Sequence, residues 1–212
     1  MTPDQPPPNP SSPPSDQPLP APIATTPRLT LRPFHLSDAP ALAIIANNPR
    51  VAYNLTSTYP SPYTLDNAHY WCRTANAASP PLNYAIIETS TSALIGSVGF
   101  TRAAHPDKRR ALTLGYWLGE AWWGQGLMAE AVSAVVGWAF ETWDAGDDRL
   151  ERVEGCAYAR NGASAKVLEK VGFLFEGRKR AAETKGGEVL DLMMYGVTRG
   201  DWEARRGQGG GR

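Results

Sequence analysis

A strand-like run, a pair of glycines and a helical run follow one another directly between Leu114 and Phe140, in LGYWLGEAWWGQGLMAEAVSAVVGWAF. Gly124 and Gly126 stand just before the helical pattern begins. Glycine accepts the backbone of such a turn and leaves the first N–H groups of the helix accessible. These groups and the positive end of the helix dipole attract phosphate. The segment therefore predicts a turn that binds a cofactor carrying a pyrophosphate.

The composition predicts one folded domain in a reducing compartment. The chain has 212 residues, with 21 basic and 21 acidic side chains and two cysteines, Cys72 and Cys156. Balanced charge gives no indication of nucleic-acid binding, and two cysteines make neither a disulfide framework nor zinc-ligand spacing. No apolar run is long enough to cross a bilayer. We expect a cytoplasmic protein, with nuclear access left open, that binds neither nucleic acid nor a membrane.

The two ends of the chain differ from the rest. The N-terminal segment is rich in proline, has few large apolar side chains and lacks the pattern of a secretory or mitochondrial signal. Such a segment cannot bury enough apolar surface to offset the entropy lost on ordering. We expect a disordered tail at 1–25, a folded domain at 26–205 and a flexible end at 206–212.

Apolar periodicity predicts a mixed α/β domain between these ends. Strands are expected at 28–32, 83–88, 93–101, 109–120, 152–158, 173–180 and 189–197. Helices are expected at 39–48, 63–78, 127–142, 162–172 and 198–205. Thr64 and Asn161 are suited to begin helices, and Gly172 to end one. This order indicates an α/β (α+β) fold with a largely antiparallel central sheet of about six to seven strands flanked by helices.

Five motifs stand in order between Thr26 and Trp202: TPRLTLRPFHLSDA, ALIGSVGF, LGYWLGEAWWGQGLMAEA, ARNGASAKVLEKVGFLFEG and LDLMMYGVTRGDW. Through them the chain resembles the GNAT superfamily of acyl-CoA N-acyltransferases, and within it the ribosomal-protein N-terminal acetyltransferases. Ala121 departs from the pattern, because Gln or Arg is usual there. The resemblance implies transfer of an acetyl group from acetyl-CoA to a primary amine, a protein N-terminus or a small molecule, by direct attack in a ternary complex.

The resemblance also implies where acetyl-CoA binds. An N–H of the strand before the turn would polarise the thioester carbonyl, at about Tyr116, Trp117 or Leu118. Asn161 would hydrogen-bond the pantetheine region, and Ser164 would lie near the sulfur. The backbone of the turn would hold the pyrophosphate, at Trp122, Trp123, Gly124, Gln125, Gly126, Leu127 and Met128. Purely local roles stay open: sheet packing for Tyr116 or Trp117, and satisfaction of first-turn backbone groups for Asn161 and Ser164.

Three residues are candidates for catalytic proton transfer. Ser164 could protonate or hydrogen-bond the departing thiolate, and Glu154 or Glu120 could accept a proton from the amine, directly or through water. A lysine amine, with a pKa of about 10.4, needs such a base, whereas an α-amine at about 7.7–8.0 is already partly neutral. A solvated or paired carboxylate is the alternative for both residues, and Glu130 is interpreted as structural.

Three other interpretations compete with this one. The segment from Gly124 to Ala129 also fits the G-x-G-x-x-A fingerprint of dinucleotide-binding proteins, with Glu151 as a possible ribose ligand. This segment, however, follows strands that are expected to be antiparallel. Cys156 could carry an acyl group covalently, although no His or Asp is near it in sequence. Finally, the chain could be an acyl-CoA-binding scaffold whose proline-rich tail recruits partners. Each would have to be distinguished from acetyl transfer by experiment.

The remaining polar residues bear on metals and on the acceptor. His35, His69 and His105 have no ligand spacing, so we expect no metal. The loops at 51–71 and 77–83 are rich in Tyr and Asn with few charges, and we expect them to form a neutral, flat or peptide-like acceptor side. Both a monomer and a homodimer are compatible with the sequence.

Overall fold

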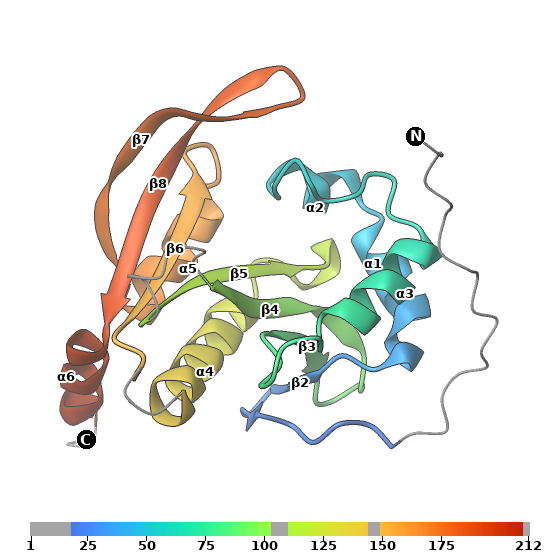
Figure 1. The fold of residues 1–212 in the computed structure, drawn as a ribbon, viewed down its shortest axis with the longest axis horizontal. Helices are drawn as coiled ribbons and strands as arrows, with labels where there is room; N and C mark the ends of the chain where they lie inside the picture. The colour runs from blue at the N-terminus through green and yellow to red at the C-terminus, as the bar shows by residue number, and fades with distance from the viewer. Residues whose placement is uncertain (1–17, 103–109, 144–148, 210–212) are drawn as a thin grey trace, which may run out of the picture.

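The computed structural model describes residues 18–102, 110–143 and 149–209, which form one eight-stranded sheet with helices on both faces (Figure 1). The strands are β1 (Ala24–Thr25), β2 (Leu29–Pro33), β3 (Asn83–Glu88), β4 (Leu94–Arg102), β5 (Ala111–Leu118), β6 (Arg152–Tyr158), β7 (Leu174–Lys185) and β8 (Glu188–Thr198). The helices are α1 (Ala39–Ala46), α2 (Pro49–Tyr53), α3 (Leu65–Thr74), α4 (Leu127–Thr142), α5 (Gly162–Val171) and α6 (Arg199–Gly209). Short 3-10 helices stand at Leu36–Asp38 and Glu120–Trp122.

The sheet is mixed and largely antiparallel, as expected. Its strand order is β1-β2-β3-β4-β5-β6-β8-β7, and only the β5–β6 pair of these described strands is parallel. The eighth strand exceeds the expected six to seven. It is β1, where Ala24 pairs with Leu31 and Thr25 with Thr30. A strand of two residues is too short to show a period in the sequence.

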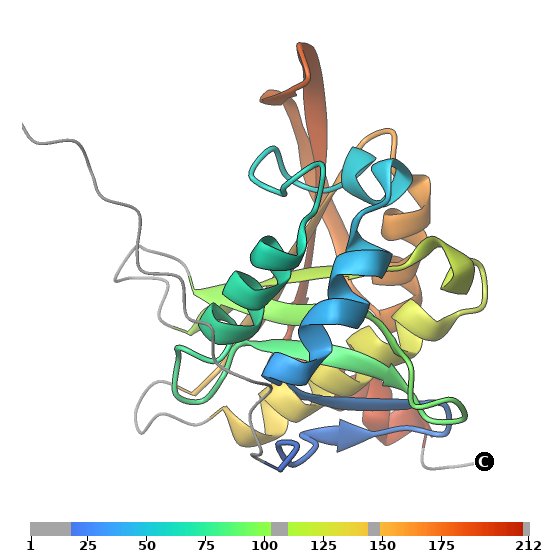
Figure 2. The same ribbon diagram turned by 90° about the vertical axis from the view of Figure 1, so that its right-hand side faces the viewer.

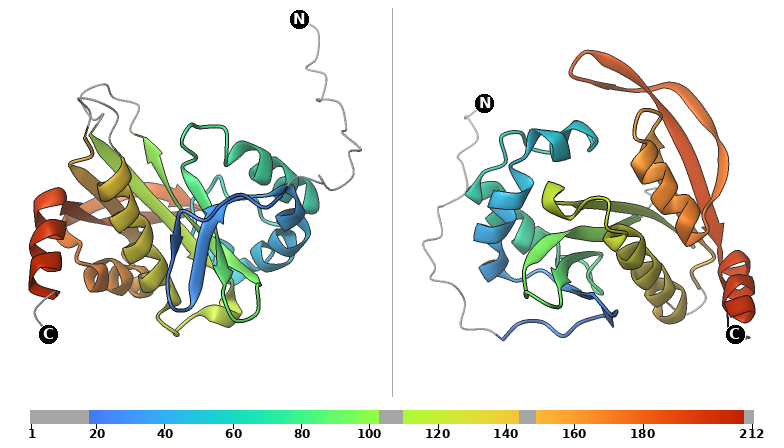
Figure 3. Two further views of the ribbon diagram at one scale, coloured as in Figure 1. Left: turned by 90° about the horizontal axis from the view of Figure 1, so that it is seen from below. Right: turned by 180° about the vertical axis from the view of Figure 1, so that it is seen from behind.

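Two apolar cores lie on opposite faces of the sheet. Figure 2 shows α1 and α3 in front of the strands and α4 behind them, and Figure 3 shows α4 and α5 together on one face. Strand β3 serves both cores by alternation, because Tyr84 and Ile86 face α4 whereas Ala85 faces α1 and α3. The larger core includes Val132, Val135 and other residues at helical spacing on α4. The two cores fix the central strands from both sides.

Most expected elements form, with shifted ends. The expected helix at 39–48 stops at Ala46, and Pro49 begins the separate helix α2, because proline suits a first helical turn but not a helix interior. The strand expected at 109–120 ends at Leu118, with Glu120 in a 3-10 helix. Helix α6 runs to Gly209, past the expected 205. Residues 1–17, His105, Arg109 and 210–212 lie outside the described residues.

A buried ion pair joins β2 to the first helices. Arg32 donates two hydrogen bonds to the carboxylate of Asp38, at 2.8 and 2.7 Å, and both residues are less than a tenth exposed. Asp38 also accepts the backbone N–H of His35 at 2.7 Å. The carboxylate therefore has partners for both oxygens, as a buried charge requires.

We expect Asp38→Ala to lower the free energy of unfolding by about 3–5 kcal/mol, because it leaves the Arg32 charge buried without its partner. Denaturant titration measures the change. Asp66→Ala is the control, because Asp66 is exposed in the first turn of α3 and should cost less than about 1 kcal/mol. Equal small losses in the two variants would contradict the prediction.

Candidate functional site

Strands β5 and β6 pair over only three residues before they separate. The parallel register joins Ala111 to Arg152, Leu112 to Val153 and Thr113 to Glu154. Beyond that point β5 continues to Leu118, and β6 continues to Tyr158 while pairing with β8 on its other side (Figure 1). Among the described residues, the edge of Leu114–Leu118 that faces β6 has no strand partner. Backbone groups on such an edge are available to an extended ligand.

The glycine turn leads from this open edge into helix α4. Gly124 and Gly126 have φ angles of +74° and +77°, which residues with a β-carbon rarely adopt. The turn is tied by its own side chains: Trp123 donates its indole N–H to the carbonyl of Leu118 at 2.8 Å, and Gln125 donates to the carbonyl of Ala121 at 3.0 Å. Gln125 thus contributes its side chain to the turn.

Helix α4 begins without a side-chain cap. Gly126 is its N-cap residue and supplies no hydrogen-bonding side chain to the first N–H groups of this 16-residue helix. Leu127 and Met128 follow in the first turn with their side chains in the core. The first backbone N–H groups therefore remain available for an anion, which the helix dipole also favours.

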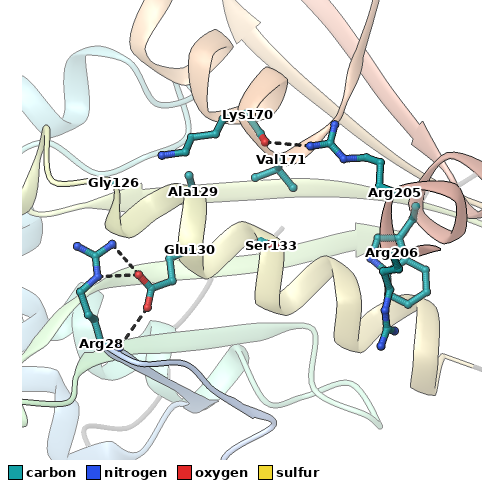
Figure 4. Close-up of a pocket in the computed structure, with 10 residues that line it drawn as sticks. Arg28, Gly126, Ala129, Glu130, Ser133, Lys170, Val171, Arg205 and Arg206 are labelled. Carbon is teal, nitrogen blue, oxygen red and sulfur yellow. Dashed lines mark hydrogen bonds and ion pairs between the residues drawn. The ribbon is translucent and has the colours of Figure 1, made fainter. Parts of the chain in front are cut away.

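Two basic side chains, those of Arg28 and Lys170, lie beside this helix end (Figure 4). A cavity of about 410 Å³ lies beside it and includes Gly126, Arg28, Lys170, Arg205 and Arg206 in its lining. Arg28 Nη2 and Lys170 Nζ lie 3.8 and 3.9 Å from the point that a β-carbon of Gly126 would occupy. Arg28 directly precedes β2, Lys170 lies in α5 and the other two arginines lie in α6, so no local motif in the sequence could have indicated this grouping. The Lys170 ammonium adds to the positive charge of the helix end, whereas the Arg28 guanidinium is paired with Glu130.

Glu130 organises one wall of this cavity, which agrees with its interpretation as structural. Its carboxylate accepts hydrogen bonds from Arg28 Nε at 2.7 Å and from the Thr26 hydroxyl at 2.6 Å. Partial burial raises the pKa of Glu130, but the hydrogen bonds from Thr26 and Arg28 outweigh it and lower that pKa overall. Arg28 also donates to the carbonyl of Gln125 at 3.0 Å. The start of β2 is thereby fixed to the glycine turn.

Tyr116 and Ser164 meet across the gap between β5 and β6. The Tyr116 hydroxyl lies 2.8 Å from Ser164 Oγ, and Asn161 Oδ1 accepts the Ser164 backbone N–H at 3.2 Å, which confirms Asn161 as the cap of α5. Leu118 is buried in the larger core. Trp117 packs on the opposite face, with its ring 6.2 Å from that of Tyr59. The strand thus sends Tyr116 and Trp117 to opposite faces, and both pack against other residues.

The two candidate bases lie toward opposite ends of β5. Glu154 is paired in register with Thr113 and accepts a hydrogen bond from Arg152 at 3.1 Å. Glu120 follows β5 at its other end, where it accepts from Asn48 at 2.8 Å and forms an ion pair with Arg50. The structure does not bring the two carboxylates to one place, and each already has an arginine partner. Glu120 joins the turn to the start of α2.

The structure bears on the competing interpretations as well. A dinucleotide fingerprint belongs to a doubly wound parallel sheet, whereas only one described strand pair here is parallel. Partial desolvation, with a smaller contribution from Glu183, raises the pKa of the Cys156 thiol, which disfavours the reactive thiolate. His35 caps a 3-10 helix through its ring. Within the described ranges, no group of three or more His, Cys, Asp or Glu is placed to hold a metal ion.

The order of elements, the open β5 edge and the glycine turn can now be compared with known proteins. The sequence profile of the acetyltransferase (GNAT) domain matches residues 28–174, more than half of the chain. The chain belongs to this family. The match covers the β5–α4 turn and the Asn161–Ser164 motif, which were the two elements of the expected cofactor site.

Relatives of this GNAT domain are named as N-acetyltransferases. The chain is 29% identical over 181 residues to Uncharacterized N-acetyltransferase p20 of Bacillus licheniformis, covering 84% of this chain and 96% of the relative. It is 25% identical over 123 residues to [Ribosomal protein uS5]-alanine N-acetyltransferase of Escherichia coli, covering 58% and 60%. A solved ribosomal alpha-N-protein acetyltransferase in complex with coenzyme A has the same fold, with a TM-score of 0.69, 22% identity, and coverage of 84% and 98%. Together these findings identify an acyltransferase of the N-acetyltransferase class.

None of the helices in the described parts of the chain is both long and apolar enough to cross a membrane.

We expect Gly126→Ala to lower the free energy of unfolding by about 1–2 kcal/mol, because alanine is strained at the left-handed φ of this residue. Gly162→Ala is the matched control. A β-carbon there meets no atom within 4 Å, and alanine in a helix is favoured over glycine by up to about 1 kcal/mol. Thermal or denaturant unfolding of both variants gives the comparison. A control as destabilised as Gly126→Ala would refute the assignment of strain to the turn.

Proposed function

We propose that this protein transfers an acetyl group from acetyl-CoA to a primary amine, by direct attack of the amine within a ternary complex. One observation carries the proposal: β5 separates from β6 after Thr113, and its open edge runs on to the turn at the uncapped start of α4. An open strand edge suits an extended amide-containing arm, and an uncapped helix start between cations suits a pyrophosphate. Acetyl-CoA has both groups, joined in this order.

The residues of the site have separate tasks in this proposal. The backbone from Trp122 to Met128 holds the pyrophosphate, and Lys170 adds positive charge beside Gly126, where Arg28 is paired with Glu130. The free edge of Leu114–Leu118 receives the pantetheine arm, and one of its N–H groups polarises the thioester carbonyl. Ser164 donates a hydrogen bond toward the departing sulfur. When bound, acetyl-CoA supplies the activated acetyl group.

The ion pairs of the two candidate bases favour an α-amine as the acceptor. Glu154 and Glu120 each form an ion pair with an arginine, so both carboxylates are already engaged where a lysine amine, with a pKa of about 10.4, would need a free base. An α-amine, with a pKa of about 7.7–8.0, is partly neutral near pH 7 and needs only a weak acceptor for its proton. The name of the Escherichia coli relative, which acts on the alanine of a ribosomal protein, points the same way.

A second cavity supports a peptide-like acceptor. It measures about 530 Å³ and lies between the segment 49–61 and the tip of the β7–β8 hairpin. Its described lining includes Tyr53, Ser57, Thr58 and Tyr59 but no acidic side chain, so it offers hydroxyl groups and aromatic rings. Lys185 at the hairpin tip donates to the backbone carbonyls of Ala52 and Leu55. Such a lining suits neutral peptide groups better than a polycation.

We expect CoA release with short peptides that have a free N-terminus, rising with pH as the α-amine loses its proton at about 7.7–8.0. The measurement is thiol detection across a panel. Each peptide contains a lysine and is compared with the same peptide after acetylation of its N-terminus. The panel also includes a polyamine. The N-acetylated peptides and the polyamine should react at least about tenfold more slowly. Acetyl-CoA binding without turnover of any amine would favour the scaffold interpretation instead.

We expect Lys170→Gln to weaken acetyl-CoA binding about fivefold, the equivalent of about 1 kcal/mol for an exposed ion pair. High salt should reduce the difference between the variant and the unmodified protein, because exposed charges are screened. Lys166→Gln is the control, because Lys166 is exposed on the same helix and does not line the cavity. Calorimetric titration of both variants decides the matter, and identical affinities for the two would exclude a contact between Lys170 and the cofactor.

A further inference from the structure

A pair of hydroxyl groups bridges the gap between β5 and β6. The Tyr116 hydroxyl oxygen lies 2.8 Å from Ser164 Oγ and 3.2 Å from the Ser164 carbonyl oxygen. Tyr116 belongs to β5, whereas Ser164 lies in the first turn of α5, which follows β6. The contact therefore joins the two sides of the gap at a level where β5 still pairs with β4 but no longer pairs with β6.

Both members of this pair are fixed independently of each other. The ring of Tyr116 packs against the larger core, which sets the position of its hydroxyl. The backbone N–H of Ser164 is held by the side chain of Asn161 at 3.2 Å. A serine in a first helical turn commonly turns its hydroxyl back to nearby backbone groups. Here the hydroxyl is directed to a tyrosine of another element instead.

The number of protons limits what the pair can do. Tyr116 has one hydroxyl proton, which can go to Ser164 Oγ or to the Ser164 carbonyl oxygen. If Tyr116 donates to Oγ, the proton of Ser164 is left over and can be donated to a third group. A thiolate placed beside Ser164 selects this arrangement, because a charged acceptor forms the stronger hydrogen bond.

Tyr116 is unsuited to act as the acid itself. Burial raises its pKa to about 12, although the hydrogen bond with Ser164 acts in the opposite direction. A thiol of the cysteine type has a pKa of about 8.5, so proton transfer from Tyr116 to the thiolate is unfavourable by more than about three orders of magnitude. Tyr116 can therefore donate a hydrogen bond but does not give up its proton.

We propose that Tyr116 is a positioning residue, which holds the Ser164 hydroxyl so that it donates a hydrogen bond to the departing CoA thiolate. This inference rests on the proposed function. In the step, the amine nitrogen forms a bond to the acetyl carbon, the bond from that carbon to sulfur breaks, and sulfur keeps the electron pair. Ser164 stabilises that charge by a hydrogen bond, while the proton lost by the amine leaves separately to water or a carboxylate. The covalent O–H bonds of Ser164 and Tyr116 stay intact.

The bound CoA thiol reports this hydrogen bond directly. Its pKa is measured by pH titration of the ultraviolet absorbance of the thiolate, and the same titration with desulfo-CoA subtracts the protein's own thiols. We expect a pKa below about 8.5 with the unmodified protein, and a return toward that value in Ser164→Ala and Tyr116→Phe. The double variant should show no further shift. Ser164→Thr, which keeps a hydroxyl, should retain most of the lowered pKa.

Turnover gives the second measurement. We expect kcat to fall about 10- to 100-fold in Ser164→Ala and Tyr116→Phe, with KM for acetyl-CoA changed less than about threefold. Tyr158→Phe is the matched control. Tyr158 is another buried tyrosine, but its hydroxyl bonds to Glu183 at 2.8 Å, so its loss should leave the thiol pKa unchanged. Thermal unfolding checks that each variant is folded.

Two results would overturn the inference. A thiol pKa that moves in Ser164→Ala but not in Tyr116→Phe would show that Ser164 needs no tyrosine to hold it. A thiol pKa that moves in neither variant would show that the Ser164 hydroxyl does not reach the sulfur. Both results leave acetyl transfer standing. Failure of the transfer itself would be recognised differently, as CoA binding with a lowered thiol pKa and no turnover of any amine.

Discussion

Three residue pairs hold the two halves of the sheet together at the backbone. Strands β1–β5 lie on one side of the parallel contact between Ala111–Thr113 and 152–154, and β6, β8 and β7 lie on the other. If β5 and β6 stayed paired past this contact, β6 would cover the edge of β5. Instead the Tyr116 side chain reaches across toward α5, and the glycine turn begins at the far end of β5. Both parts of the proposed cofactor site exist because this pairing is short.

The open edge stays open because other contacts fix each side of it. Helix α4 packs under the sheet through the larger core, which includes Val153 of β6 as well as Leu112 of β5. Around the turn, Arg28 and Glu130 connect β2 to α4, and Glu120 connects to Arg50 of α2. A backbone edge without a partner costs free energy unless water or a ligand satisfies it. The surrounding packing offsets that cost.

Local features of the structure could be predicted from the sequence. Helix α4 and strand β6 have the expected bounds residue for residue, because their apolar periods are strong and their ends are marked. Asn161 and Gly172 begin and end α5 as expected. The features that could not be predicted from the sequence depend on residues that lie far apart in it. Lys170 beside Gly126, Glu120 beside Arg50 and Tyr116 beside Ser164 are contacts of tertiary packing, and no local pattern specifies them.

The position of β8 has a consequence for how the chain folds. Strand β6 lies between β5 and β8, and its whole length from Arg152 to Tyr158 pairs with β8, whereas only its first three residues pair with β5. Because β8 spans Glu188–Thr198, a growing chain cannot complete this pairing until these residues have been synthesised. Until then β6 would expose a nearly complete strand edge. Premature termination before β8 should therefore yield an aggregation-prone product, even though all the residues of the cofactor turn would already be present.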